Sequence, residues 1–90
     1  METKITFEEY LRKENLSENT ITSYLWTVNY FNANYDVVSK ENLLAYKGYL
    51  MEFFKPKTVN LRIQAINKYL EYLEEQQLQL KAVKVQQKNF

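Results

Sequence analysis

The stretch Lys55–Gln77, KPKTVNLRIQAINKYLEYLEEQQ, decides the fold because it joins a helix start to a long apolar stripe. Pro56 suits the first turn of a helix, where its missing N–H is not needed, and it prevents an unbroken helix from arriving from the left. Thr58 is a candidate N-cap. Apolar side chains then recur at helical spacing, which predicts one buried face: Val59, Ile63, Ile66, Leu70 and Leu73.

The opposite side of this helix mixes cations, small residues and hydrogen-bonding groups. Its members are Lys57, Thr58, Leu61, Arg62, Gln64, Ala65 and Lys68. Exposed faces of this kind lie in DNA grooves. An ordinary solvated helix face has the same composition, and on this helix alone that simpler interpretation is favoured.

The composition predicts one small domain and excludes several classes of enzyme. The chain has 90 residues, one glycine, one proline, no cysteine and no histidine. So few helix breakers predict long regular elements with short connections. The absence of cysteine excludes disulfides and thiol catalysis, and the absence of histidine removes the commonest general base and metal ligand. Zinc enzymes and Ser-His-Asp hydrolases are therefore excluded, and we expect no cofactor.

The chain also lacks the sequence features of a membrane or secreted protein. No apolar run approaches the roughly 20 residues of a membrane span, and the start METKITFEEY lacks the apolar core of a signal peptide. We therefore expect a cytoplasmic protein without a membrane partner. The net charge of +1 gives no basic footprint for the whole chain. Acids concentrate near the N-terminus and bases follow from Lys55 onward, which permits a local positive face.

Three further helices are predicted before Lys55, and each has a capping residue. The predicted ranges are Phe7–Lys13, Glu18 to Asn32 or Asn34, and Lys40–Phe53, with caps at Thr6, Ser17 and Ser39. Glu9 completes a capping box with Thr6. In the third helix, Leu44 and Met51 widen the apolar band, and Gly48 is a candidate for close helix–helix contact. The prediction is an all-α fold, a small four-helix bundle with antiparallel neighbours and short turns.

Two features lie outside this core pattern. Trp26 and Tyr30 are one turn apart and off the main stripe of the second helix. We favour packing under the first helix or the C-terminal tail, and an exposed aromatic pair for a partner is the alternative. After Gln77 the apolar pattern changes to period 2, which predicts an extended segment that leaves the bundle. The predicted division is a helical domain over residues 1–77 and a linker over residues 78–90.

Residues Thr6 to Gln77 resemble the N-terminal core-binding domain of phage-integrase-type tyrosine recombinases, the SAM-like DNA-binding module. The resemblance is carried by LSENTITSYLWTVNYF (Leu16 to Phe31) and KTVNLRIQAINKYLEYL (Lys57 to Leu73). It covers about four-fifths of the chain, and the order, spacing and helix lengths of the two motifs make it more specific than either alone. It implies a small orthogonal four-helix bundle, and the tail LKAVKVQQKNF looks like the linker toward a catalytic domain of the same parent chain.

The resemblance implies that the second and fourth helices grip double-stranded DNA at a recombination site. Carried over by position, the DNA-binding residues are Asn19, Thr20, Ser23, Thr27, Lys57, Thr58, Leu61, Arg62, Ala65 and Lys68. The cations would reach phosphates or bases, Thr20 and Thr58 would donate to phosphates, and Leu61 and Ala65 would contact thymine methyl groups. For both threonines, simple helix capping stays an equal alternative.

The resemblance also limits what this chain does. The family's catalytic set consists of Arg, Lys, His, a second Arg, His or Trp, and Tyr, and the chain has only Arg12 and Arg62 as arginines and no histidine. We therefore expect DNA binding without catalysis, with other recombinase protomers on DNA as further candidate partners. Two alternatives stay open. One is a helical protein-interaction module without DNA binding, and the other is a complete small regulator that binds DNA alone.

Overall fold

The computed structural model describes residues 5–84, and within this range the regular elements are all helices, without strands. The elements in this range are α1 (Phe7–Lys13), α2 (Glu18–Asn34), α3 (Lys40–Phe53), α4 (Pro56–Tyr72) and a 3-10 helix, η1 (Gln76–Leu78). The predicted all-α class and the four helices are confirmed, and α2 ends at the later of its two predicted ends.

Three of the helices begin after a Thr or Ser whose side-chain oxygen accepts a hydrogen bond from an amide of the first turn. The Thr6 hydroxyl accepts from the Glu9 N–H at 3.1 Å, and the Glu9 carboxylate accepts from the Thr6 N–H at 3.0 Å, so the predicted capping box is present. Ser17 and Ser39 cap α2 and α3 as predicted. The predicted cap at Thr58 is wrong. Because Pro56 already has helical geometry, α4 begins there, after Lys55, and no side chain caps it.

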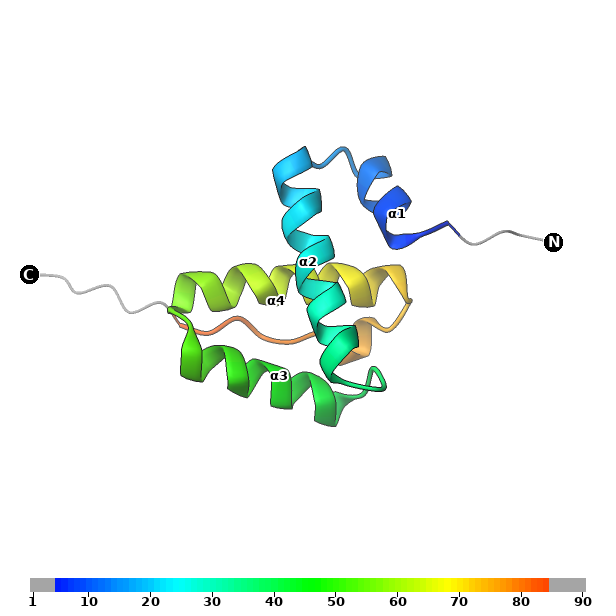
Figure 1. The fold of residues 1–90 in the computed structure, drawn as a ribbon. Helices are drawn as coiled ribbons and strands as arrows, with labels where there is room; N and C mark the ends of the chain where they lie inside the picture. Colours follow the sequence, from blue (N-terminus) through cyan, green and yellow to red (C-terminus); the bar gives the residue numbers. More distant parts are fainter. Residues whose placement is uncertain (1–4, 85–90) are drawn as a thin grey trace, which may run out of the picture.

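The elements are arranged around α4, as Figure 1 shows. α2 crosses α4 steeply, α3 lies beside α4 in the opposite direction, and α1 covers the first half of α2. The buried side chains come from every helix: Phe7, Leu11, Ile21, Val28, Phe31, Leu43, Tyr46, Leu50, Val59, Ile63, Ile66 and Leu70. Four of the five residues predicted for the buried face of α4 are in the core, whereas Leu73 follows the end of α4 and is only half-buried. The crossing places the outer sides of α2 and α4 next to each other.

The wide apolar band predicted for α3 is only partly buried. Leu44 and Met51 are 51% and 56% exposed, so their predicted place in the core is wrong. The expected close contact at Gly48 is also wrong, because a Cβ placed there would meet nothing within 4 Å. α3 therefore packs through a narrow stripe and leaves apolar side chains at the surface.

The segment after α4 does not leave the bundle, which corrects the prediction for residues 79–84. This segment, which we call the strap, turns back after η1 and runs between α3 and α4, antiparallel to α4 (Figure 1). Leu80 is only 8% exposed and joins the core, and Val83 packs against it. The remainder of the predicted linker, residues 85–90, lies outside the described residues. No helix in residues 5–84 is long and apolar enough to cross a membrane.

Candidate nucleic-acid interface

A shallow groove lies where the first half of α2 meets the outer side of α4. Its cavity volume is about 210 Å³, and its lining residues are Asn19, Thr20, Ser23, Tyr24, Leu61 and Gln64. Four of these are predicted DNA-contacting residues, and they come from two helices about 40 positions apart in the chain. The steep crossing of α2 over α4 brings them to one surface.

The groove presents mainly uncharged hydrogen-bonding groups on the α2 side. The Thr20 N–H donates to the Ser17 hydroxyl oxygen at 3.2 Å, and the Ser17 hydroxyl donates to Thr20 Oγ1 at 2.9 Å. Thr20 therefore takes part in the cap of α2, while its own hydroxyl proton stays available to an acceptor in the groove. Asn19 and Ser23 are exposed one turn apart. On the α4 side, Leu61 is 57% exposed.

The first turn of α4 supplies the positive charge near this groove. Lys55 and Lys57 are exposed, and neither forms an ion pair within residues 5–84. Thr58 is half-buried in the same turn. The amides of Lys57 and Thr58 have no intrahelical acceptor, because they precede the first closed turn, and no side chain caps them. The beginning of α4 therefore combines lysines with amide donors, the groups that bind phosphate oxygens.

Arg62 points into the junction of α2 and α4. Its Nη1 donates to Thr27 Oγ1 at 3.0 Å, and its guanidinium carbon lies 4.6 Å from the ring centroid of Trp26. Its Nε is buried and has no hydrogen-bond partner. Within the protein, Arg62 thus holds Trp26 and Thr27 in place, whereas the sequence predicted a direct contact with DNA.

Two predicted contact residues are inside the molecule, which corrects their assignment. Thr27 and Ala65 are each 0% exposed. The Thr27 hydroxyl donates to the Ser23 carbonyl at 2.9 Å while it accepts from Arg62. Ala65 lies on α4, which packs against α2, and its methyl group is fully buried. Neither side chain reaches a ligand at the surface in this conformation.

Lys68 lies near the groove, but its charge is compensated by the protein. Its Nζ lies 2.6 Å from Glu14 Oε1 and 3.0 Å from Glu71 Oε2. The hydrogen bond to Glu14 holds the pKa of Lys68 above its ordinary value, and the hydrogen bond to Glu71 adds to this shift. Lys68 therefore ties the end of α1 to α4 and adds little positive potential to the surface.

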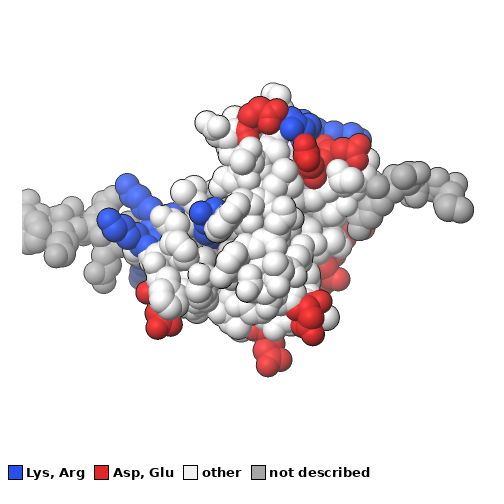
Figure 2. All heavy atoms as spheres, viewed as in Figure 1, with Lys and Arg blue, Asp and Glu red and all other residues white. Residues whose placement is uncertain are grey.

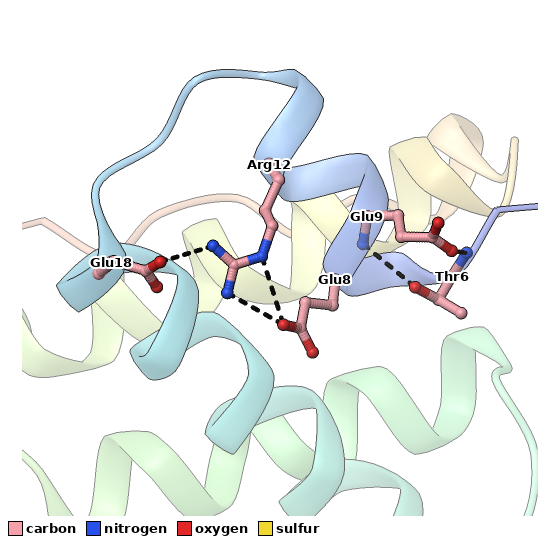
Figure 3. Close-up of polar contacts among 5 residues, drawn as sticks. All are labelled: Thr6, Glu8, Glu9, Arg12 and Glu18. Carbon is pink, nitrogen blue, oxygen red and sulfur yellow. Dashed lines mark hydrogen bonds and ion pairs between the residues drawn. The ribbon is translucent and has the colours of Figure 1, made fainter.

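The start of α2 is the acidic end of the groove. Arg12 bridges two carboxylates: its Nη1 lies 2.6 Å from Glu18 Oε1 and its Nη2 lies 3.0 Å from Glu8 Oε2 (Figure 3). The hydrogen bond from Arg12 lowers the pKa of Glu18, and the one to Glu18 raises the pKa of Arg12. Figure 2 shows acidic and basic side chains next to each other at this end, whereas basic side chains gather where α4 begins. The two ends therefore differ: the carboxylates of Glu8 and Glu18 share Arg12, while Lys55 and Lys57 form no ion pair within residues 5–84.

The expected cover over Trp26 is also wrong. Trp26 is 53% exposed and stacks on Tyr30, with ring centroids 5.7 Å apart. Tyr30 stacks in turn on Tyr49, which contacts Phe53. These rings form an aromatic surface beside Arg62, and Phe53 is 65% exposed. Of the pair that the alternative interpretation expected to be exposed, only Trp26 is exposed, because Tyr30 is half-buried and packs against the core.

Some groove residues were missed by the sequence-based assignment. Gln64 was placed on the outer side of α4 but not among the DNA contacts, and Tyr24, which is half-buried against the core, was not considered as a contact. The helical step from Leu61 to Gln64 is the signal that identifies Gln64. No three Asp or Glu side chains in residues 5–84 come together in a way that would hold a metal ion.

No protein-family model, no curated protein and no solved structure matches this chain. The candidate interface therefore depends on the geometry and charges of the chain itself.

Proposed function

We propose that this chain is a double-stranded DNA-binding module, the part of a site-specific tyrosine recombinase that grips the recombination site without catalysing strand exchange. The observation that supports it best is the α2–α4 groove, which gathers Asn19, Thr20, Ser23, Leu61 and Gln64 on one exposed surface. Such side chains read base edges and sugar–phosphate groups. Catalysis would reside in a catalytic domain of the same parent chain.

The charges suggest how DNA would lie on this surface. Lys55 and Lys57 at the beginning of α4 would bind phosphates, together with the two unpaired amides of the first turn. At the start of α2, Glu8 and Glu18 share the single guanidinium of Arg12, so this end offers no free cation to the backbone and the duplex would lie toward α4. With few free cations, the isolated module would bind in the roughly micromolar to 100 μM range typical of non-specific contacts.

An NMR titration with a short duplex at two salt concentrations tests this proposal. We expect amide shifts at residues 19–23 and 57–64 that weaken at higher salt, because phosphate contacts release counterions. Lys57→Ala should reduce both the affinity and its salt dependence. Lys40→Ala, which removes the same charge from the first residue of α3, is the matched control and should change little.

The result that would overturn the proposal is the absence of shifts in the groove even at low salt. A specific observation supports one other function, a protein-interaction module. Trp26 and Phe53 are each more than half exposed and are joined through the rings of Tyr30 and Tyr49, and a continuous exposed apolar patch is typical of a protein-interaction site. Shifts confined to these residues, seen only with a protein partner, would favour that function.

A further inference from the structure

The strap is held in its groove by two asparagines of α4, each of which forms a pair of hydrogen bonds with one backbone position. Asn60 Nδ2 donates to the Val83 carbonyl at 3.0 Å, and the Val83 N–H donates to Asn60 Oδ1 at 2.8 Å. Asn67 does the same with Leu80, at 2.9 and 2.8 Å. An amide side chain can satisfy a backbone N–H and C=O together, so each pair fixes both position and direction.

The spacing of the two pairs matches the geometry of both segments. Asn60 and Asn67 are seven residues apart in a helix, a rise of about 10.5 Å. Val83 and Leu80 are three residues apart in an extended chain, about 10 Å. Gln79 has the extended angles φ −58° and ψ 144° where the strap begins. A slip of one residue would break both pairs at once, so the register of the strap is unique.

Further contacts keep the strap in this register. Lys47 Nζ of α3 donates to the Lys81 carbonyl at 2.6 Å, and Gln79 Nε2 donates to the Asn67 carbonyl at 3.3 Å. The side chains of Leu80 and Val83 face the core. The strap is therefore part of the folded domain, and its antiparallel course leads the chain to the beginning of α4.

Docking of the strap places Lys84 beside the start of α4. Lys84 and Val83 line one hollow of about 160 Å³ together with Pro56, Met51, Phe54 and Val59. Pro56 stands between Lys55 and Lys57 in the sequence, so Lys84 lies close to the part of the chain that carries these two lysines. Figure 2 shows the basic side chains gathered there.

From this geometry we infer that the docked strap completes a cationic cluster of Lys55, Lys57 and Lys84 that binds phosphate groups of nucleic acid. Asn60 and Asn67 are positioning residues for that cluster. This inference rests on the proposed DNA-binding function. A ligand that binds the complete cluster must stabilise docking, and docking must raise the affinity for the ligand by the same factor.

The first experiment measures docking by hydrogen exchange of the Leu80 and Val83 amides. Both amides should be protected in the free protein, because each donates to an asparagine oxygen. Addition of a duplex at low salt should raise their protection further. Asn60→Ala should remove protection at Val83, with circular dichroism as the check that the helices persist.

The second experiment measures DNA affinity for Asn60→Ala, Lys84→Ala and the double variant. Each single variant should bind about fivefold more weakly at 0.1 M salt and lower the salt slope by about one, the loss of one phosphate contact. The double variant should be no weaker than either single variant, because both changes remove the same contact. Lys81→Ala is the matched control: it removes a lysine charge from the strap but keeps the carbonyl that Lys47 binds, and it should change the affinity little.

Three results would overturn the inference. If Asn60→Ala releases the strap but leaves affinity and salt slope unchanged, the coupling is wrong while DNA binding stands. If the losses of DNA affinity from the two single variants add in the double variant, Asn60 and Lys84 act separately, and the positioning role of Asn60 is wrong. If the unaltered protein binds no duplex, the proposed function fails together with the coupling, and the exchange data still report whether the strap docks.

Discussion

The two polar sides of α4 look alike in the sequence and differ in the structure. On one side Asn60 and Asn67 are saturated by the backbone of the strap. On the other side Leu61 and Gln64 face an open groove with Asn19 and Ser23. A polar side chain on a helix can therefore bind a ligand only when its donors and acceptors are not already bonded to another part of the chain.

Charged side chains on α4 likewise differ in whether another part of the protein already compensates them. Lys57 and Lys68 are both lysines on the predicted contact face, but only Lys68 is paired with carboxylates, those of Glu14 and Glu71. A formal charge contributes to a surface potential only to the extent that neighbouring charges leave it uncompensated. The open side of α4 is therefore less basic than its sequence indicates. Within residues 5–84, the α4 cations without a carboxylate partner are Lys57 in the first turn and Arg62, whose guanidinium lies against Trp26 and Thr27.

The largest expected change in stability comes from a glutamate placed in the core of α4, compared with a glutamate placed in the groove. Ala65→Glu should unfold most molecules at 25 °C, because an unpaired carboxylate in a fully buried site costs several kcal/mol, about the whole stability of a small domain. Leu61→Glu, one turn away at a site 57% exposed, should change stability by about 0.5 kcal/mol or less. Urea denaturation measures both. Equal stabilities would mean that Ala65 is at the surface.

The next largest change in stability is expected on the side of α4 that the strap covers, compared with the side that faces the groove. Asn67→Ala leaves the Leu80 N–H and C=O without partners in a partly buried site, so we expect a loss of about 2 kcal/mol in the free energy of unfolding. Gln64→Ala, on the open side, should cost about 0.5 kcal/mol or less. Denaturant titration of both variants tests the comparison. A neutral Asn67→Ala would show that the strap adds nothing to the fold.

A smaller effect distinguishes two roles of Arg62. Arg62→Lys keeps the charge but loses the planar group that binds Thr27 and stacks on Trp26, so we expect a loss of about 1 kcal/mol. The emission of Trp26, the sole tryptophan, should change as well. The salt slope of DNA binding should stay the same. A stable variant with a reduced slope would return Arg62 to the DNA-contacting set.

The smallest change in stability is expected at acid pH. Acid should weaken the contacts made by carboxylates and leave those made by asparagine side chains unchanged. The hydrogen bond from the Thr6 N–H lowers the pKa of Glu9, and the one from Arg12 lowers the pKa of Glu18. Their contribution to stability is complete above the ordinary carboxyl pKa of 4.5 and is lost as the pH falls through the lower folded value. The asparagine pairs do not titrate.

NMR spectra recorded between pH 6 and pH 3 (about the range in which carboxyl groups titrate) measure this difference. Signals of α1 should change first, while the strap amides of Leu80 and Val83 stay protected. Glu9→Gln keeps an acceptor for the Thr6 N–H without a titrating group, so it should weaken the pH dependence at the start of α1. Simultaneous loss of α1 and strap signals would contradict the separation of the two kinds of contact.

Much of the fold was predictable because its signals are local. Thr6, Ser17 and Ser39 each precede an apolar stripe, and each caps a helix in the structure. The site was predictable only in part. The sequence indicated Asn19, Ser23 and Leu61 correctly as exposed, but Thr27 and Ala65 are buried where α2 crosses α4. A helical wheel gives the direction of a side chain and not the neighbour that it meets.

The docking of the strap is the feature of the fold that the local sequence indicates least. Residues 79–84 have no period that distinguishes a free linker from a docked one, and Asn60 and Asn67 look like ordinary polar residues of a helix. Their pairing with Val83 and Leu80 joins positions far apart in the chain. No local propensity encodes such a contact, because it depends on the equal rise of two segments that meet only after folding.

The helices, three of their four N-caps and most of the core stripes follow from the sequence, since they depend on hydrogen bonds and apolar spacing within a few residues. Tertiary contacts set which polar groups stay open, which lysines are paired with carboxylates and where the chain runs after α4. The crossing of α2 over α4 forms the groove, the pairing of Lys68 with Glu14 joins α1 to α4, and bonds to Lys47, Asn60 and Asn67 hold the strap.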